Sequence, residues 1–216
     1  MTVISYEELK QIFDLVESST RTESRYNVAP TQQVAVVRSN GENNILTSMR
    51  WGLIPSWSKD ATIASHTINA RCETITEKPA FRHAIKYSRC IIPISGFYEW
   101  SHTDGKKIPH FIHLPDCSPM SLAGIWEHWK NPEGQEIETF SILTTTANSL
   151  LSSLHDRMPV ILQPEYYNLW LSKSMHHPQE LAHLYQPFPT DRMTLYEVSN
   201  LVNNPRFDSP ACIVQV

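Results

Sequence analysis

The sequence predicts an α+β fold, built as one domain around an antiparallel β-sheet with helices at its edges. With 216 residues, 41% of them hydrophobic and 19% charged, the chain has the composition of one globular domain rather than of a disordered or coiled-coil protein. Apolar runs in the middle of the chain favour strands, and helical patterns lie before and after them. Because these patterns do not alternate regularly, a doubly wound parallel sheet is disfavoured, and residues 1–216 are treated as one domain.

A first helix is predicted over residues 5–17. Ser5 and Glu8 form a capping-box pattern at its start. Its apolar side chains recur at helical spacing: Leu9, Ile12, Phe13 and Val16. We therefore expect an amphipathic helix with one face on the core.

Further elements follow in order along the chain. Residues 33–38 and 45–54 are predicted strands of a hairpin with Gly41 in its turn. Residues 77–88 have helical character, and Pro79 is tolerated in the first turn of a helix. Four apolar runs then predict a meander that forms the core of the sheet: 89–100, 109–114, 121–129 and 138–146. The remaining predictions are helices over 147–155, 163–172 and 178–186 and a strand over 193–199.

The charge balance limits the partners. The 22 Asp and Glu residues outnumber the 18 Lys and Arg residues, which excludes a uniformly basic nucleic-acid coat but allows a local basic groove. No apolar run approaches the length of a membrane span, and the first residues lack a signal-peptide pattern, so we expect a cytoplasmic protein without a membrane partner. The cysteines have no CxxC spacing and are expected to be reduced thiols: Cys72, Cys90, Cys117 and Cys212.

Four polar residues lie where turn or strand geometry alone does not require them. Glu99 lies between two aromatic residues of a predicted strand, and His155 lies where a predicted helix gives way to a strand. Glu99 can equally be an outward-facing carboxylate, and His155 a favourable imidazole at a helix C-terminus. Asn69 also fits a turn, and Arg71 a surface ion pair. None of the four identifies a function alone.

Cys72 could act as a thiolate nucleophile with His155 as its base. A buried, unreactive cysteine is the commoner case. The histidines show no spacing suited to zinc, and the glycine-rich nucleotide loops and the GxSxG pattern of serine hydrolases are absent. We therefore expect no metal site and no cofactor.

Seven motifs become specific when they are taken together, because they follow one another in a fixed order over nearly the whole chain. They are RYNVAPTQ (25–32), MRWGLIPSW (49–57), NARCET (69–74), KPAF (78–81), RCIIPISGFYEW (89–100), HDRMPVIL (155–162) and VSNLVNNP (198–205). In this order and approximate spacing the sequence resembles the SRAP family, named for SOS-response-associated peptidase, whose members are abasic-site sensors that cross-link to single-stranded DNA. The resemblance implies a twisted, barrel-like antiparallel sheet, a basic channel, and single-stranded DNA with abasic sites as the partner.

The resemblance also implies roles for individual residues. In the family, the amine and thiol of an N-terminal cysteine condense with the abasic-site aldehyde to form a thiazolidine. Glu99 would shuttle protons during this condensation, and His155 would assist opening of the sugar and reversal of the adduct. Asn69 would orient the sugar or the reacting terminus, Asn27 would position the same segment, and Arg71 would bind phosphate.

The first residues depart from the family pattern. Members begin Met-Cys-Gly-Arg-Phe, usually followed by a pair such as Thr-Val, whereas this sequence reads Met1-Thr2-Val3. The nucleophilic cysteine and a DNA-contacting arginine are therefore missing from it. The four cysteines present cannot substitute, because an internal residue has no free α-amine. As written, the chain is expected not to form the thiazolidine.

Three hypotheses of function result. The first is an abasic-site sensor of single-stranded DNA, with covalent capture belonging to the full-length form. The second is noncovalent binding of single-stranded DNA through Arg71, with bases stacked on Trp51 and Trp57. The third is a thiol peptidase that uses Cys72 and His155. A monomer is expected, because the sequence has no sustained heptad pattern.

Overall fold

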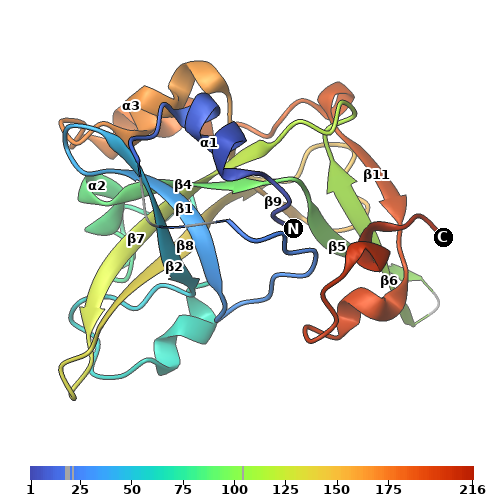
Figure 1. Ribbon diagram of the computed structural model, residues 1–216, viewed down its shortest axis with the longest axis horizontal. Helices are drawn as coiled ribbons and strands as arrows, with labels where there is room; N and C mark the ends of the chain where they lie inside the picture. The colour runs from blue at the N-terminus through green and yellow to red at the C-terminus, as the bar shows by residue number, and fades with distance from the viewer. Residues whose placement is uncertain (18–19, 21, 104) are drawn as a thin grey trace.

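The computed structural model describes residues 1–17, 20, 22–103 and 105–216 and contains two β-sheets that adjoin in the middle of the molecule (Figure 1). The larger sheet has eight strands, and five of them close into a barrel because β7 pairs with both β4 and β8. Around the barrel the order is β1, β2, β8, β7, β4, and only β2 and β8 run parallel. The strands are β1 (Gln33–Ser39), β2 (Asn44–Trp51), β3 (Asn69–Arg71), β4 (Arg89–Ile94), β7 (Met120–Lys130), β8 (Glu136–Thr146), β9 (Arg157–Pro159) and β10 (Ile161–Leu162).

The smaller sheet has three antiparallel strands in the order β11, β6, β5. They are β5 (Phe97–Thr103), β6 (Lys106–His113) and β11 (Thr194–Glu197). The predicted four-strand meander is therefore wrong, because β6 pairs with β5 and β11 and not with β7. The run predicted as one strand over 89–100 is divided at Gly96, where an added Cβ would lie 2.3 Å from the Phe111 ring and 2.6 Å from the Ile112 carbonyl oxygen. Here the chain leaves the barrel and enters the smaller sheet.

The first hairpin and the first helix confirm their predictions. Strands β1 and β2 pair along their whole length, and Gly41 in the turn has a φ of 111°. Helix α1 spans Tyr6–Phe13, and the Ser5 hydroxyl accepts a hydrogen bond from the Glu8 N–H at 3.2 Å. The helix ends before residue 17, because Asp14 adopts a left-handed conformation with a φ of 50°.

The other predicted helices differ from expectation in length or in helix type. Residues 147–155 form turns, because the Asn148 side chain accepts the Leu151 N–H at 3.0 Å and so competes with helical bonding. Within the predicted range 77–88 only α2 (Ala84–Tyr87) is an α-helix. The predicted range 163–172 is divided between the 3₁₀ helix η2 (Pro164–Tyr166) and α3 (Tyr167–Leu171), and the range 178–186 is the 3₁₀ helix η3 (Pro178–Tyr185). Outside the predicted helices lie four further 3₁₀ turns: η1 (Thr62–His66), η4 (Thr190–Arg192), η5 (Asn200–Asn203) and η6 (Pro210–Ile213). None of the helices in the described residues has the length and apolarity needed to cross a membrane.

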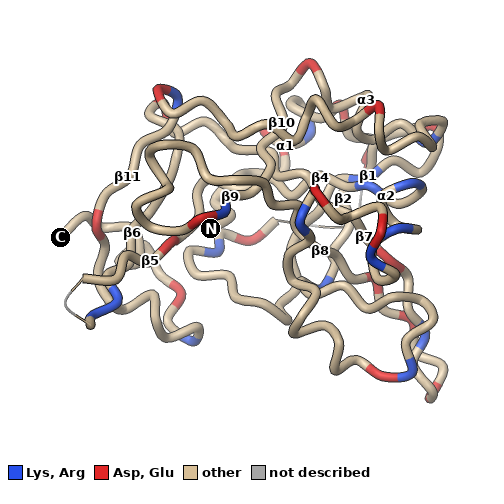
Figure 2. Tube along the Cα trace, turned by 180° about the vertical axis from the view of Figure 1, so that it is seen from behind, with Lys and Arg blue, Asp and Glu red and all other residues tan. Residues whose placement is uncertain are grey.

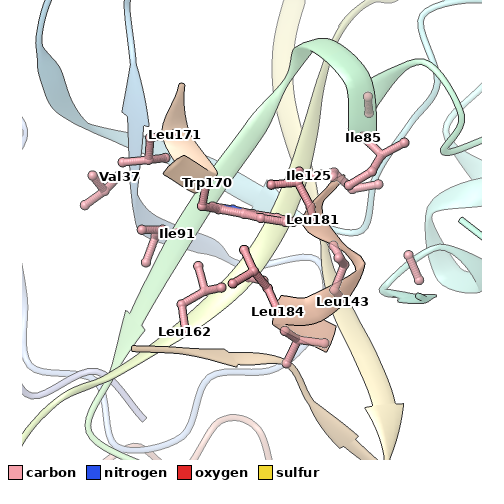
Figure 3. Packing of buried hydrophobic residues seen from close by; sticks show 14 of the residues in the cluster. Val37, Ile85, Ile91, Ile125, Leu143, Leu162, Trp170, Leu171, Leu181 and Leu184 are labelled. Atoms are coloured by element: carbon pink, nitrogen blue, oxygen red, sulfur yellow. The ribbon is translucent and has the colours of Figure 1, made fainter. Parts of the chain in front are cut away.

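Alternate residues of the barrel strands face two separate cores. Val36 belongs to the cluster inside the barrel, and its neighbour Val37 belongs to a cluster outside it. The outer cluster surrounds Trp170 of α3, which is fully buried, and α1 and η3 also contribute to it (Figure 3). Because both faces of these strands are buried, the barrel is a rigid support for the residues at its open end.

Candidate active site between the two sheets

A cavity of about 640 Å³ lies where the barrel meets the smaller sheet. The barrel contributes apolar side chains from its interior: Val34, Trp51, Ile92, Ile94, Leu122, Phe140 and Ile142. Strand β5 contributes Phe97, Tyr98 and Trp100, and loops around residues 27–30 and 202–205 complete the wall. Within the described part of the chain, Lys107 is the only residue with a charged side chain in this lining. The cavity is therefore a mostly apolar chamber with a cation at its edge.

Glu99 lies on β5 between two residues that line the cavity. Phe97 packs against the interior of the barrel, and strand alternation places Glu99 on this same face of β5. Burial raises the pKa of the Glu99 carboxyl group above its ordinary value, and the charge of His155 partly opposes this shift. The structure thus brings Glu99 and His155 within electrostatic reach of each other. A carboxyl group with a raised pKa suits proton transfer near neutral pH.

His155 precedes β9, and its side chain is half-exposed. Its Nδ1 accepts the N–H of Arg157 at 2.9 Å and also lies 3.2 Å from the Asp156 carboxylate. Because the backbone N–H occupies the lone pair of Nδ1, the neutral ring carries its proton on Nε2. That N–H is left available to a bound molecule.

Asn69 and Arg71 lie on β3, at one end of the strand order of the larger sheet. They pair with Ile142 and Thr144 of β8, and both side chains are exposed while Ala70 between them is buried. They therefore project from the same face of the strand. In the residues that the structure describes, no hydrogen bond or ion pair occupies the Arg71 guanidinium, so it is free to meet an anion.

Arg157 and Glu73 belong to the motifs of the sequence but were not singled out by sequence reasoning. The Arg157 guanidinium donates to both carboxylate oxygens of Glu73, at 2.7 and 2.8 Å, and to the Thr144 carbonyl oxygen at 2.7 Å. These bonds fasten the turn after β3 to the start of β9, and so fix the spacing of Arg71 and His155. The sequence signal that could have found them is that Glu73 belongs to the motif NARCET and Arg157 to the motif HDRMPVIL.

The two predicted tryptophans differ in their positions. Trp51 lines the cavity, is stacked on Phe140 with ring centroids 6.5 Å apart, and donates its indole N–H to the Ile68 carbonyl oxygen at 2.9 Å. Trp57 lies in an exposed loop with 62% of its surface accessible, and it does not line the cavity. Only Trp51 is therefore brought together with the other predicted residues.

Asn27 is buried in the wall of the cavity. Its side-chain amide donates to the carbonyl oxygens of Val202, Asn204 and Phe207, at 3.0 to 3.1 Å. Arg25 pairs with Asp208 beside it, and the Asp208 carboxylate also accepts the Asn27 N–H. The amide donor of Asn27 is thus used inside the protein, where it fixes one loop of the cavity to another.

The first residues of the chain lie along the turn between β4 and β5. The Met1 amine donates to the Gly96 carbonyl oxygen at 2.9 Å, and the Met1 carbonyl oxygen accepts the Ser95 N–H at 3.0 Å. Ser95 and Gly96 thus lie opposite the single residue Met1, which is the pattern of an antiparallel β-bulge. Burial lowers the pKa of the Met1 amine to about 5. Met1 also lines the cavity, so the chain enters it beside β5.

Cys72 opens into a second cavity of about 480 Å³, which Tyr185 and residues of η3 also line. Burial raises the pKa of the Cys72 thiol, which disfavours the thiolate that a nucleophile requires. The Nδ1 atom of His155 is engaged by Arg157. The geometry therefore gives no support to a Cys72–His155 pair.

Lys and Arg residues are interspersed with Asp and Glu rather than gathered into one continuous strip (Figure 2). The basic channel implied by the family resemblance is therefore not evident as a separate feature of the chain trace. At the cavity, the cation of the described lining is Lys107, whereas Arg71 lies outside the lining on β3.

Comparison with known proteins agrees with the motifs. The family model for SOS response associated peptidase (SRAP) matches residues 1–205. The chain is 47% identical to the abasic site processing protein YoqW of Bacillus subtilis, over 87% of this chain and 84% of YoqW. It is 42% identical to YoaM of the same organism, also an abasic site processing protein, over 95% of this chain and 92% of YoaM. A crystal structure of a protein from Bacteroides thetaiotaomicron is 37% identical, with a TM-score of 0.79, over 86% of this chain and 82% of that one. The predicted α+β class with a barrel-like sheet is confirmed.

Proposed function

The chain belongs to the SOS response associated peptidase (SRAP) family, and on this premise we propose that it recognises abasic sites in single-stranded DNA. The observation that carries the proposal is the electrostatic interaction of Glu99 with His155, together with the cavity that β5 and the first residues of the chain line. We further propose that the protein acts as a monomer in the cytoplasm.

Covalent capture is proposed for a form of the chain that carries Cys-Gly-Arg-Phe before Thr2. The phenylalanine then takes the place of Met1, opposite the bulge at Ser95 and Gly96. If the antiparallel pairing continues along β5, the arginine lies opposite Phe97, the glycine opposite Tyr98 and the cysteine opposite Glu99. This register supports a role for Glu99 next to the reacting amine.

The chemistry needs proton transfers that Glu99 and His155 are suited to make. The α-amine of the cysteine attacks the aldehyde of the open abasic sugar, and water leaves as the imine forms. The thiol then adds to the imine carbon, and its proton passes to the nitrogen to complete the thiazolidine. Glu99, whose pKa is raised, can give a proton to the departing oxygen and take one from the amine. The Nε2–H of His155 can donate to the ring oxygen of the sugar as it opens.

The decisive experiment compares the 216-residue chain whose sequence is printed above, here the printed chain, with a version that has Cys-Gly-Arg-Phe inserted after Met1. Each is incubated with single-stranded DNA that contains one abasic site, followed by a denaturing gel and intact mass. Only the extended protein should give a heat-stable adduct, and a Ser-Gly-Arg-Phe version is the matched control. An adduct from the printed chain would contradict the proposed role of the cysteine.

Glu99→Gln in the extended protein should slow cross-linking by roughly 10²- to 10⁴-fold with little change in DNA affinity. Glutamine keeps the shape of the side chain and removes the proton transfer. Cross-linking at the parental rate would show that Glu99 is only a strand carboxylate.

Noncovalent binding of single-stranded DNA is the second candidate. It is favoured by the unoccupied Arg71 guanidinium and by the exposed ring of Trp57, neither of which requires the cysteine. The printed chain should then bind abasic and intact oligonucleotides equally. Tighter binding of the abasic oligonucleotide would favour the first proposal.

A further inference from the structure

Thr31 adopts a backbone conformation that β-branched residues rarely adopt, with a φ of 76°. It is the third residue of the turn Ala29–Gln32, in which the Gln32 N–H donates to the Ala29 carbonyl oxygen at 3.3 Å. Pro30 occupies the second position of this turn. Proline followed by a positive φ is typical of a type II β-turn, whose third position favours glycine or asparagine. Threonine is therefore a strained choice here.

Two other non-glycine residues in the described part of the chain have a positive φ, and both have ordinary surroundings. Asp14, with a φ of 50°, caps the end of α1, where aspartate tolerates the left-handed conformation. Cys117, with a φ of 58°, lies in an exposed turn after β6. Neither lines the cavity, so both serve as comparisons for Thr31.

No contact within the described protein accounts for threonine at position 31. Its side chain is exposed, and among the described residues its hydroxyl group makes no hydrogen bond. Its backbone N–H donates to the Trp51 carbonyl oxygen at 2.8 Å, a bond that glycine or asparagine would also make. Within the described residues nothing offsets the strain at Thr31, and its exposed hydroxyl group is open to a molecule outside the chain.

The position of Thr31 indicates which molecule this is. Pro30 lines the cavity, and Trp51, which accepts the Thr31 N–H, lines it as well. The Trp51 indole in turn donates to the Ile68 carbonyl oxygen, directly before Asn69 of β3. Thr31 does not itself line the cavity, but it directly follows Pro30, which does, and it is joined through Trp51 to the strand that carries Arg71.

We propose that Thr31 is a DNA-positioning residue whose hydroxyl group donates a hydrogen bond to a backbone phosphate of the bound strand beside the cavity. This inference rests on the proposed recognition of abasic single-stranded DNA. The rigid type II turn holds the hydroxyl in place before DNA arrives, so little side-chain freedom is lost on binding. A neutral donor adds affinity without releasing a counterion, which distinguishes Thr31 from Arg71.

The test uses the printed chain and a short fluorescent oligonucleotide with a stable abasic analogue, measured by anisotropy at several salt concentrations. Thr31→Val keeps the branched shape and the backbone strain but removes the hydroxyl. It should weaken binding about tenfold, the effect of losing one hydrogen bond to a charged group, and leave the salt dependence unchanged. Thr31→Ser should restore most of the affinity.

A second measurement separates strain from binding. Thr31→Asn should raise the melting temperature by roughly 2–4 °C, because asparagine suits this turn position. Cys117→Asn is the matched control, since it changes a positive-φ residue away from the cavity and should leave DNA affinity unaltered.

The outcomes distinguish a failure of the Thr31 inference from a failure of the proposed recognition of abasic DNA. If the unmodified chain fails to bind abasic DNA, both are overturned. If that chain binds and Thr31→Val binds equally well, only the role of Thr31 is overturned. A changed salt slope in Thr31→Val would contradict a neutral contact to phosphate.

Discussion

Glu99 is a carboxyl group that is difficult to ionise where it lies, and this makes the stability of the protein depend on pH. Burial raises its pKa, so the folded protein keeps this proton to a higher pH than the unfolded chain does. The contribution of Glu99 to the free energy of unfolding is therefore fully present below the unfolded pKa and is lost as the pH rises through the folded pKa.

Glu99→Gln should remove this pH dependence. As the pH rises above about 4, the unmodified protein should lose stability relative to the variant, because the Glu99 carboxyl group ionises and the glutamine amide does not. Urea unfolding at a series of pH values measures the difference.

Glu73→Gln is the control for this series, because its pH dependence has the opposite sign. Hydrogen bonding to Arg157 lowers the pKa of Glu73, so the stability that Glu73 adds is present above its unfolded pKa and is lost as the pH falls through its folded pKa. If the free energy of unfolding changes with pH in the same way for the unmodified protein and for Glu99→Gln, the pKa of Glu99 is not raised.

Arg71 can be tested by the salt dependence of DNA binding. Arg71→Ala should flatten the slope of log affinity against log salt by about 0.7, the value for one lost phosphate contact on single-stranded DNA. Binding should weaken similarly for all base sequences, since a backbone contact carries no sequence information. Arg82, exposed next to α2, supplies the control, because Arg82→Ala should leave the slope unchanged. An unchanged slope in folded Arg71→Ala would remove Arg71 from the DNA path.

Among the strands, β8 organises the site because it pairs with β3 on one side and β9 on the other at its C-terminal end. The Glu73–Arg157 pair joins these two neighbours over the same stretch. A substitution that loosens this pair changes the relative positions of Arg71 and His155 without touching either residue.

Arg157→Ala should lower the free energy of unfolding by about 1–2 kcal/mol, because the lost bonds include the one to the Thr144 carbonyl. Glu73→Gln should cost less than about 1 kcal/mol, because Glu73 is nearly half exposed and solvent screens its charge. Urea titration of both variants shows which of them loses more unfolding free energy. An equal loss would show that the hydrogen bond from Arg157 to the Thr144 carbonyl oxygen adds no stability.

An element could be predicted from the sequence where the residues that determine it lie close together in the chain. Capping by Ser5 and the turn at Gly41 act within a few residues, so α1 and the first hairpin could be predicted. The division at Gly96 depends on the approach of Phe111, a contact between strands that no periodicity reveals. Glu99 could be singled out as a candidate from its local motif. Its interaction with His155 and the Glu73–Arg157 pair could not be predicted, because both depend on how distant strands pair.

For the molecule as a whole, Asn27 joins an early loop to a late one. Asn27→Ala would leave carbonyl groups of Val202, Asn204 and Phe207 without their donor in a buried place, and should cost about 2 kcal/mol of unfolding free energy. Asn43→Ala, at an exposed position in the turn of the first hairpin, should change it by less than about 0.5 kcal/mol. Hydrogen exchange should show loss of protection around residues 202–207 in Asn27→Ala only, and equal protection in both variants would contradict the role of Asn27.

The contacts of Asn27 also determine when, during synthesis, the protein becomes competent to act. Asn27 and Val202 are 175 residues apart, and Arg25 and Asp208 are 183 residues apart. A nascent chain that has reached residue 199 has already made every strand of both sheets, but the loop that closes the cavity is still missing. Folding of the site must therefore follow the release of residue 208 from the ribosome. The cavity is thus complete only in a chain whose synthesis has passed residue 208.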